Sequence, residues 1–481
     1  MKSITEVTQK RKLPVRVLQF GQGNFLRAFV DYMIDVYNEK CDGNLGIVII
    51  KNTKGGNVSL YEEQKNLFTV VVRGILENRT YCENRIIRSV QDIFSIYDDY
   101  MKFEEYVKLD TLRFIVSNTT EAGIVCSEND KYGDTPPASY PAKLVKLLFQ
   151  RYSHFNGDSS KGLIIIPTEL IDNNGEVLKD CVLKTISRFC LPDEFKHWVE
   201  ESCIFCSTLV DRIVSGFPSD SEQIFEEIGY RDRLMTTCEP YSLFVIQSER
   251  DITDELPLHK ANLPVIFTND ATPYRKRKLH ILNGAHTASV VSGFLHGFNT
   301  VYEMMQNEVF VQYIRRFLFE EVIPTIGIEK NELEQFAESV FTRFSNPYLN
   351  HYLEAISVNS ITKFIARILP SFKQYYVMYD RLPNTMLFSL AAILVFYMSQ
   401  SKDRLIGRRE NGDEYSAIET GQITEYLLKY SSKNNFVELV LSNATIWGEN
   451  LCRYDGLYSL VNNYVNSIMQ NGVINTMSCI L

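Results

Sequence analysis

The sequence lacks a hydrophobic run long enough to span a membrane, and it lacks an excess of positive charge. Its longest apolar run, residues 386–398, is shorter than the roughly 20 residues that a membrane-spanning helix needs. Lysine and arginine number 50 against 59 aspartates and glutamates, which gives a formal net charge of -9. Binders of nucleic acid or anionic membranes need clustered positive charge. We therefore predict a buried helix at 386–398 and expect a small molecule as the partner, with no nucleic acid and no membrane.

Signals for export, for a disulfide framework and for structural zinc are also missing. The first twenty residues include basic side chains but no apolar run before a small-residue cleavage site, so we expect a cytoplasmic protein. The ten cysteines then predict reduced core thiols. Cys203 and Cys206 form a CxxC pair in an apolar, strand-like run, but no second pair completes the ligand set of a zinc site. No metal site is predicted.

What is present is a pattern of two structural halves. A length of 481 residues with 45% hydrophobic residues is typical of a globular chain with two or three domains. The first half alternates helical patterns with short β-rich runs, which lie at 15–20, 46–51, 68–74, 113–118 and 162–170. This alternation predicts a largely parallel sheet covered by helices. Helical patterns dominate after about Thr272. We predict an α/β domain over 1–270 and a mostly helical, all-α domain over 271–481.

A pair of glycines follows the first predicted strand. Gly21 and Gly23, in the segment FGQGNFLRAFVD, precede a helical pattern. A dinucleotide site needs glycines where the backbone turns tightly and approaches the pyrophosphate, which the N-terminus of the next helix then binds. Leu26 replaces the third glycine of the usual pattern, so a plain strand-to-helix turn remains an alternative. We predict that Gly21, Gly23, Asn24 and Phe25 bind a dinucleotide cofactor.

Two later segments bear on the same cofactor. The acidic residue that would bind the adenosine ribose after the second strand is absent, and Lys51, Asn52 and Lys54 occupy this stretch. The residues alone therefore leave NAD and NADP open. The fourth strand ends in SNTTEAG, at the edge where a parallel sheet binds its ligand. We predict that Asn118 and Thr119 contact the ribose or the nicotinamide, with a solvated turn as the alternative.

The segment KLHILNGAHT, at the start of the helical half, carries groups suited to the reduction of a ketone. Hydride transfer to a ketone needs a proton donor and dipoles that stabilise the developing alkoxide. On an α-helix, Lys278, Asn283 and His286 share one face and His280 points away. We predict that Lys278 gives the proton, Asn283 donates to the oxyanion and His286 binds a substrate hydroxyl. A solvated helix start, with His286 as a core histidine, is the alternative.

Three basic residues precede Lys278. The pKa of a lysine must be lowered by burial or by neighbouring positive charge before it can exchange protons near neutrality. Arg275, Lys276 and Arg277 supply such charge, and Arg275 falls on nearly the same helical face as Lys278. The guanidinium groups could instead bind a substrate carboxylate, which matches their planar geometry.

The spacing of Lys278, Asn283 and His286 resembles the KxxxxNxxH signature of the polyol-specific long-chain dehydrogenases, the mannitol dehydrogenase family. The segments FGQGNFLRAFVD, SNTTEAGI, STLVDRIVSG and EPYSLFVI resemble the tagaturonate-reducing branch of this family more closely. The resemblance spans nearly the whole chain. It implies a metal-free enzyme with an N-terminal Rossmann-type domain, a C-terminal helical domain and an active site between them.

The resemblance also implies roles for single residues. The lysine at Lys278 is the general acid-base, and the residues at Asn283 and His286 hold the reacting oxygen and the substrate. Asp211, in the segment VDRI, is implied as a substrate-side residue. Lys363 matches a lysine near the family's substrate site, and Asn359 lies beside it. Together with Arg275, these are the predicted substrate-binding residues.

Two departures from the family pattern narrow the implied activity. Mannitol-type members carry an Asp-Asn pair after the strand that reads IIIPTEL here, and Leu170 replaces the asparagine of their oxyanion hole. This change argues against simple polyols. The acidic residue after the second strand is also missing, so NADP is not excluded, although the tagaturonate-reducing branch uses NAD.

The resemblance therefore implies an NAD-dependent enzyme that reversibly reduces D-tagaturonate to D-altronate in hexuronate breakdown, with a sugar acid as its partner. A fructuronate reductase that makes D-mannonate and a mannitol-type polyol dehydrogenase are alternatives. A non-catalytic sugar-acid sensor is an alternative from another functional class. The sequence does not predict the oligomeric state, and a monomer is one of the alternatives.

Overall fold

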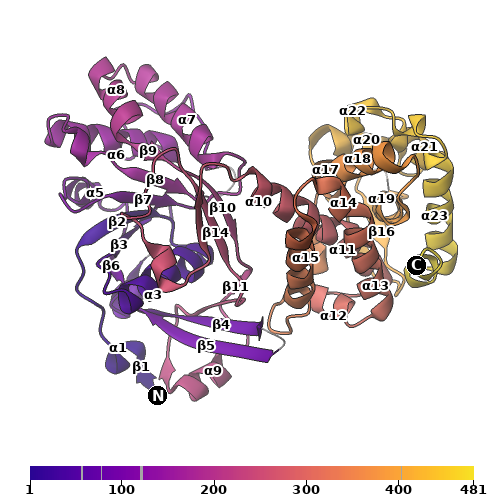
Figure 1. The fold of residues 1–481 in the computed structure, drawn as a ribbon, viewed down its shortest axis with the longest axis horizontal. Helices are drawn as coiled ribbons and strands as arrows, with labels where there is room; N and C mark the ends of the chain where they lie inside the picture. The colour runs from indigo at the N-terminus through magenta and orange to yellow at the C-terminus, as the bar shows by residue number, and fades with distance from the viewer. Residues whose placement is uncertain (56–57, 77–78, 120–122, 402) are drawn as a thin grey trace. The chain divides into compact units, whose positions relative to one another are not determined.

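The computed structural model describes the chain except for residues 56–57, 77–78, 120–122 and 402. The described residues form two compact units, Met1–Ala271 and Thr272–Leu481, each of which is described by itself (Figure 1). Within these described residues, the helices are all too short or too polar to cross a membrane.

The first unit is built on a six-stranded sheet. Its strands, in spatial order, are β6 (Val90–Ser95), β3 (Gly46–Lys51), β2 (Val15–Phe20), β7 (Phe114–Ser117), β8 (Ile164–Pro167) and β9 (Ile204–Phe205). Every neighbouring pair is parallel. If these six strands are numbered 1 to 6 along the chain, their spatial order is 3-2-1-4-5-6. This is the order of the doubly wound dinucleotide-binding fold. The predicted Rossmann-type domain is confirmed. The order reverses between β2 and β7, and ligands of such sheets bind at the carboxyl ends of these two strands.

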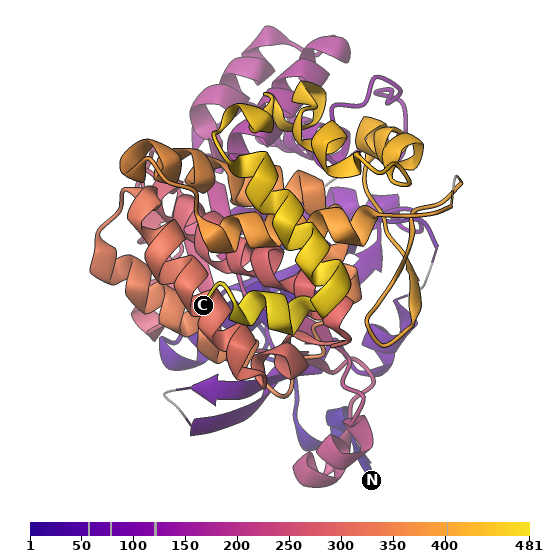
Figure 2. The same cartoon turned by 90° about the vertical axis from the view of Figure 1, so that its right-hand side faces the viewer.

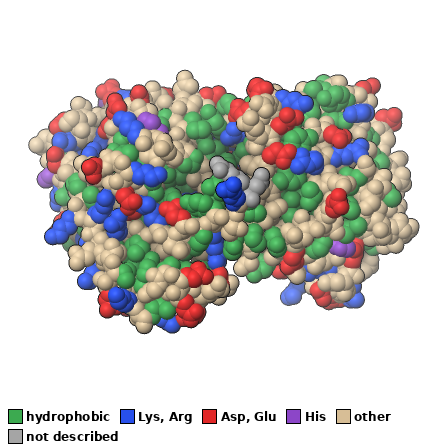
Figure 3. Space-filling view, turned by 60° about the horizontal axis from the view of Figure 1, so that its bottom comes forward, with side chains coloured by type: hydrophobic (Ala, Val, Ile, Leu, Met, Phe, Trp, Pro, Cys, Tyr) green, Lys and Arg blue, Asp and Glu red, His purple; other side chains and the backbone are tan. Residues whose placement is uncertain are grey.

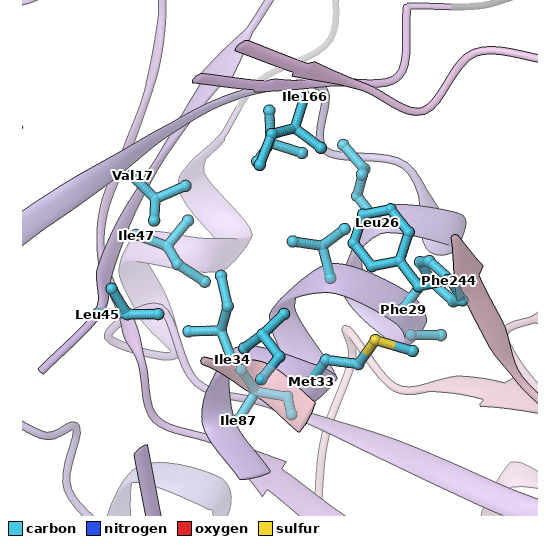
Figure 4. Close-up of a cluster of buried hydrophobic side chains, with 14 of the residues drawn as sticks. Val17, Leu26, Phe29, Met33, Ile34, Leu45, Ile47, Ile87, Ile166 and Phe244 are labelled. Atoms are coloured by element: carbon cyan, nitrogen blue, oxygen red, sulfur yellow. The ribbon is translucent and has the colours of Figure 1, made fainter. Parts of the chain in front are cut away.

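Alternate side chains of the sheet face opposite layers of the unit. Val17 and Ile47 belong to one buried cluster, whereas their neighbours Leu18 and Val48 belong to another. Figure 4 shows part of the first cluster, in which Phe29, on the helix that follows β2, packs with residues of the strands. Burial on both faces explains why the strands read as continuous apolar runs in the sequence.

The β-rich run at 68–74 lies outside this parallel sheet. It forms β4 (Phe68–Leu76), which pairs antiparallel with β5 (Arg79–Ile87) and parallel with β13 (Thr236–Cys238). β11 (Val214–Gly216) completes this four-stranded sheet. A three-stranded sheet contains β10 (Ser207–Asp211), β14 (Leu243–Gln247) and β15 (Val265–Thr268). The run at 68–74 thus predicts a strand correctly, but its apolar pattern does not reveal its partners.

The remaining elements of the first unit are helices and one pair of two-residue strands. The strands are β1 (Lys2–Ser3) and β12 (Tyr230–Arg231). The helices are α1 (Ile4–Val7), α2 (Asn24–Leu26), the π-helical turn η1 (Arg27–Asp31), α3 (Tyr32–Lys40), α4 (Ser59–Glu63), α5 (Tyr100–Val107), α6 (Tyr140–His154), η2 (Ser159–Lys161), α7 (Asn174–Arg188), α8 (Asp193–Ser202), α9 (Ser221–Ile228) and η3 (Leu258–Ala261).

The second unit is mostly helical, as predicted. Its helices are α10 (Thr272–Arg277), the π-helical turn η4 (Lys278–Leu282), α11 (Asn283–His296), α12 (Val301–Met305), α13 (Glu308–Arg316), η5 (Phe317–Val322), α14 (Ile323–Ile326), α15 (Lys330–Phe344), α16 (Leu353–Ser357), α17 (Ser360–Arg367), α18 (Leu369–Tyr379), α19 (Asn384–Tyr397), α20 (Gly421–Tyr430), α21 (Phe436–Leu441), α22 (Ala444–Trp447), η6 (Leu451–Arg453), α23 (Leu457–Asn471) and α24 (Val473–Ser478). β16 (Ile406–Arg408) and β17 (Glu414–Ser416) form a short hairpin.

Helix α11 is packed by several neighbours within this unit. It contacts α16, α17 and α19, and α19 in turn contacts α23, the long yellow helix in Figure 2. The apolar run at 386–398 forms most of α19, whose side chains are almost all buried, so the predicted buried helix is confirmed.

Surface charge is mixed on the face that Figure 3 shows, and the prediction of core cysteines holds for only part of the ten. On the face shown in Figure 3, lysine and arginine side chains are interspersed with aspartate and glutamate side chains. All ten cysteines are free thiols, and Cys203 and Cys206 are among the buried ones. The prediction that the cysteines lie in the core is wrong for Cys82, Cys190 and Cys479, which are exposed.

Candidate functional site

Gly21 shapes the first strand-to-helix turn. Its φ of +129° lies in a region that residues with a Cβ rarely adopt. Its N–H donates to the carbonyl oxygen of Ile50 at 3.1 Å. A Cβ on Gly21 would lie 2.9 Å from the carbonyl oxygen of Asn118. The turn after β2 therefore packs closely against the backbone after β7, at the point where the strand order reverses.

Gly23 opens the helix that runs through α2, η1 and α3. It has a φ of -65° and a ψ of 160°, and a Cβ on it would meet no atom within 4 Å. The N–H groups of the first helical turn lack partners within the helix, and the helix dipole is positive at this end. Open space beside these groups fits a pyrophosphate. Asn24 is exposed at this terminus. The ring of Phe25 stacks on Phe29 with centroids 5.0 Å apart, which commits this side chain to packing.

A buried carboxyl group holds the loop after β7. Glu169, which is 2% exposed, accepts hydrogen bonds at Oε1 from the backbone nitrogen and the Oγ1 of Thr119, both at 2.9 Å. Its Oε2 accepts from Ser117 Oγ at 3.1 Å. Burial raises the pKa of Glu169, and these hydrogen bonds oppose the shift. Asn118 Nδ2 donates to the carbonyl oxygen of Thr168 at 2.9 Å. Side chains thus link the carboxyl ends of β7 and β8.

Sequence reasoning placed Asn118 and Thr119 in this region but missed Glu169. A usable signal was present, because a carboxylate directly after an apolar strand lies at the edge where parallel sheets bind ligands. Leu170, the next residue, is 63% exposed. The rest of the predicted loop, residues 120–122, lies outside the described residues.

Two lysines lie at the end of β3, one buried and one exposed. Lys51 is only 3% exposed and donates to the carbonyl oxygen of Thr53. The ammonium group of Lys54 lies 5.6 Å from the centroid of the Tyr97 ring. Asn52 Oδ1 is buried and has no hydrogen-bond partner within the described part of the chain.

A π-helical turn joins Lys278 to Asn283 in the second unit. The N–H of Asn283 donates to the carbonyl oxygen of Lys278, five residues earlier. The prediction assumed α-helical spacing, whereas this wider turn brings residues five apart closer to the same side of the helix. Such turns are frequent at functional sites. His280 faces α17, since its Nδ1 lies 2.8 Å from the carbonyl oxygen of Arg367.

His286 lies about one turn beyond Asn283 and is 7% exposed. Its ring stacks on Phe344 with centroids 4.3 Å apart and meets the His351 ring edge-on at 4.9 Å. Burial is the main cause that lowers the pKa of His286 well below its usual value, and neighbouring basic groups add to it. The imidazole is therefore neutral near pH 7. Its Nε2 is buried without a hydrogen-bond partner among the residues described. This arrangement suits a hydroxyl ligand.

Helix α17 brings two basic side chains to the second unit's candidate site. Arg367 Nη1 lies 3.2 Å from Thr287 Oγ1 and 3.5 Å from the carbonyl oxygen of Asn283. Lys363 Nζ donates to the carbonyl oxygen of Ile356 at 2.8 Å.

Two arginines of the basic run before Lys278 differ in their surroundings. Arg275, in α10, is partly buried. Arg277 Nη1 lies 2.6 Å from Glu332 Oε1, and its guanidinium group lies 4.6 Å from the centroid of the Phe336 ring. The charge of Arg277 is therefore largely paired.

The other predicted substrate-side residues occupy distinct positions. Asn359 precedes α17 with a φ of 59°, and its Oδ1 is buried without a hydrogen-bond partner among the described residues. Asp211 is buried at the end of β10, opposite Leu243.

Across the described ranges, no group of three or more histidine, cysteine or carboxylate side chains is arranged to hold a metal ion.

Comparison with known proteins shows the family. The mannitol dehydrogenase Rossmann domain matches residues 15–260, and the mannitol dehydrogenase C-terminal domain matches residues 270–469. The chain belongs to the mannitol dehydrogenase family. The resemblance inferred from the KxxxxNxxH spacing is thus confirmed, and the protein is an oxidoreductase.

Relatives within the mannitol dehydrogenase family are similar over almost the whole chain. An altronate oxidoreductase of Escherichia coli O7:K1 is 40% identical over 470 residues, which cover 96% of this chain and 95% of the relative. An altronate oxidoreductase of Yersinia pestis is 39% identical over 470 residues, with 96% of each chain covered.

Solved structures of the family share the fold. The mannitol 2-dehydrogenase of Pseudomonas fluorescens, in a ternary complex with NAD and D-mannitol, matches with a TM-score of 0.73 and 21% identity over 98% of this chain and 94% of that one. A substrate-free D-sorbitol dehydrogenase matches with a TM-score of 0.79 and 20% identity over 98% of this chain and 97% of that one.

Proposed function

We propose that the protein catalyses the reversible reduction of D-tagaturonate to D-altronate with NADH, without a metal, in the breakdown of hexuronates. The observation that carries this proposal is the 40% identity to a relative named altronate oxidoreductase over 96% of the chain. The two units carry the binding groups and the proton donor that such a reaction needs.

The first unit holds the dinucleotide. The backbone at Gly21 and Gly23 and the helix terminus at Asn24 and Phe25 receive the pyrophosphate. The backbone of Asn118 and Thr119 borders the ribose and nicotinamide. When bound, the nicotinamide supplies the hydride in one direction and accepts it in the other.

NAD is the proposed cofactor, in place of NADP. A 2′-phosphate needs a cation that is available to it. Lys51 is buried and donates to Thr53, and Lys54 lies against the ring of Tyr97. Lys54 is exposed, but the buried Lys51 is already engaged, and its engagement supports the unphosphorylated cofactor.

The second unit performs the proton transfer. Lys278 gives a proton to the alkoxide oxygen that develops on the substrate, and it takes the proton back when altronate is oxidised. Asn283 donates to the same oxygen. The π-helical turn brings it close to Lys278. The neutral imidazole of His286 binds a neighbouring hydroxyl group through its unpaired nitrogen.

Asp211, Arg275, Asn359 and Lys363 are the proposed substrate-side residues. The buried Oδ1 of Asn359 supports this assignment, because a buried acceptor without a partner costs free energy that a substrate hydroxyl offsets. Asp211 offers a further acceptor, and the two cations offer partners for negative charge.

Steady-state assays of the purified enzyme test the proposal. NADH consumption is measured with D-tagaturonate, D-fructuronate and D-fructose, and each of these ketones is repeated with NADPH. The oxidation of D-mannitol is measured in the reverse direction as NADH formation from NAD+. We expect the highest kcat/KM with D-tagaturonate and NADH, and D-altronate as the product. A higher kcat/KM with D-fructuronate or D-fructose contradicts the proposed substrate, and a preference for NADPH contradicts the proposed cofactor.

A further inference from the structure

Two buried polar side chains connect the glycine turn after β2 to the helix that follows it. Gln19, in β2, and Asp31, in η1, are both 0% exposed. Gln19 Nε2 donates to the carbonyl oxygen of Gly21 at 3.2 Å and to Asp31 Oδ2 at 3.4 Å. The amide group of Gln19 thus links the carboxyl group of Asp31 to the backbone of the proposed dinucleotide-binding turn.

One oxygen atom of each side chain is left over. Gln19 Oε1 and Asp31 Oδ1 are buried, and neither has a hydrogen-bond partner among the described residues. An amide oxygen and an ionised carboxylate oxygen are both acceptors only, so neither satisfies the other. Buried polar groups in folded proteins are nearly always hydrogen-bonded. Two unpaired acceptors on one contacting pair of side chains therefore require a donor.

A proton on Asp31 supplies this donor. A protonated carboxyl group has one O–H donor beside its remaining acceptor, and a primary amide has the complementary N–H donor and acceptor. The two groups then form a cyclic pair, in which Gln19 Nε2 donates to Asp31 Oδ2 and the hydroxyl at Asp31 Oδ1 donates to Gln19 Oε1. The contact between Nε2 and Oδ2 is the first of these bonds, and the two unpaired oxygen atoms are those that the second requires.

Burial favours this proton, because it raises the pKa of Asp31 to about 7. Desolvation is the largest cause, and the charge of Asp35 acts in the same direction. The hydrogen bond from Gln19 and the charge of Arg27 act in the opposite direction. An ordinary aspartate ionises near pH 4, so Asp31 keeps its proton over about three further pH units.

Arg27, the cation that acts on Asp31, is held by other partners. Its Nη atoms donate to the carbonyl oxygen of Leu234 and to Asn24 Oδ1, and its buried Nε has no partner in the described part of the chain. The ring of Tyr61 lies 5.9 Å from the Arg27 guanidinium group, and burial raises the pKa of Tyr61, so its hydroxyl stays neutral. Arg27 therefore acts on Asp31 through its charge and does not replace the missing donor.

We propose that Asp31 holds a proton in a cyclic hydrogen-bonded pair with Gln19, and that this pair supports the dinucleotide-binding turn at Gly21. Asp31 acts on the cofactor site through Gln19 and is a positioning residue. When Asp31 loses its proton to the solvent, both oxygen atoms are again unpaired, and the support of the turn is weakened. The inference rests on the proposed dinucleotide site, whereas the proton itself is tested without a cofactor.

The first test is urea unfolding of the wild type and Asp31→Asn at several pH values. Asparagine has the shape of the protonated acid, and its amide both donates to Gln19 Oε1 and accepts from Nε2. Between about pH 5 and pH 7.5 the unfolded chain has Asp31 ionised, while the folded protein keeps the proton until about pH 7. As the pH rises over this interval, the folding equilibrium constant of the wild type should fall on the order of 50-fold relative to the variant and then level off.

Controls separate Asp31 from the other titrating groups. Asp42→Asn, the same change at an exposed aspartate, should keep the wild-type pH dependence. His286 and His351 are present in every variant, so their own pH dependence cancels. If Asp31→Asn does not fold, Asp31→Ser also removes the carboxyl group and should show the same change. An unchanged pH dependence in the Asp31 variants overturns the inference, because Asp31 is then ionised in the folded protein and a buried water supplies the donor.

The second test measures Kd for NADH by fluorescence at about pH 6 and about pH 9. In the wild type Kd should rise about 3- to 10-fold at the higher pH, the effect of losing one neutral hydrogen bond. Asp31→Asn should bind NADH with a similar Kd at both pH values. Equal rises in both proteins assign the pair to packing alone and overturn its link to the turn. A wild type that binds no dinucleotide contradicts the proposed function instead, and the unfolding comparison still decides whether Asp31 holds a proton.

Discussion

Glu169 accepts two hydrogen bonds from Thr119, one from the backbone nitrogen and one from the hydroxyl, each 2.9 Å from Oε1. Glu169 follows β8 and Thr119 follows β7, so the pair joins the ends of two neighbouring strands. Because Glu169 is buried, it needs these partners, and they in turn fix the backbone of the loop. Glu169 is therefore a positioning residue for the proposed nicotinamide side of the dinucleotide site.

Glu169→Ala should weaken NADH binding. The change removes the acceptor of the partly buried Thr119 N–H and Oγ1, which costs about 1 to 3 kcal/mol. We expect KM and Kd for NADH to rise about tenfold or more, as measured by steady-state kinetics and by NADH fluorescence. Glu169→Gln retains an acceptor oxygen and serves as the matched control. Unchanged NADH affinity in Glu169→Ala would refute the positioning role.

Gly21→Ala and Gly23→Ala should separate folding from cofactor binding. A Cβ at Gly21 meets the carbonyl oxygen of Asn118 at 2.9 Å, and the φ of +129° strains any residue with a side chain. Gly21→Ala should therefore lower both the free energy of unfolding and NADH affinity. Gly23 has ordinary backbone angles and open space, so Gly23→Ala should keep the stability and reduce only NADH affinity. Denaturant unfolding and NADH titration measure the two effects. Equal stability losses in both variants would contradict this difference.

The parts of the fold that the sequence predicts are those encoded by residue type. The strands β2 and β3 can be predicted from the sequence because burial on both faces of the sheet requires continuous apolar runs. The tight turn at Gly21 can be predicted because its backbone angle and its contact with Asn118 leave no room for a side chain, so the position requires glycine. The proposed catalytic group can be predicted because the spacing of its members matches a known family; these are Lys278, Asn283 and His286.

Other features depend on tertiary contacts that no local pattern carries. The strand β4 has an apolar run like that of β3, yet its partners are β5 and β13. The π-helical turn at Lys278 changes the spacing of backbone hydrogen bonds without changing residue type. His351 reaches the ring of His286 from a segment 65 residues later in the chain, which neither spacing nor composition predicts.

Lys278→Ala should strongly reduce turnover while NADH binding persists. If Lys278 is the proton donor, its loss should lower kcat about 10²- to 10⁴-fold, the usual contribution of general acid-base catalysis. Lys330→Ala, at an exposed lysine of α15 outside the proposed site, is the matched control and should keep wild-type kcat. Stopped assays of product formation and NADH fluorescence provide the two measurements. If kcat in Lys278→Ala remains near the wild-type value, another group gives the proton.

The histidine pair His286 and His351 should make the protein sensitive to acid. Burial is the first cause that lowers the pKa of His351, from 6.5 to about 4, and Arg343 is the second. The folded protein therefore holds this imidazole neutral, whereas the unfolded chain protonates it below about pH 6.5. The effect is absent above pH 6.5, grows as the pH falls towards 4 and then levels off. Linkage gives a loss of roughly 2 kcal/mol in the free energy of unfolding between about pH 7.5 and pH 5 from His351 alone.

His351→Gln should remove this part of the acid sensitivity. Urea unfolding of the wild type and the variant at about pH 7.5 and pH 5 measures it, and the variant should lose roughly 2 kcal/mol less over this interval. His286 has its pKa shifted in the same direction and is retained in the variant, so a smaller acid-dependent loss should remain. If the two proteins lose the same free energy between these pH values, His351 is not held neutral by the fold.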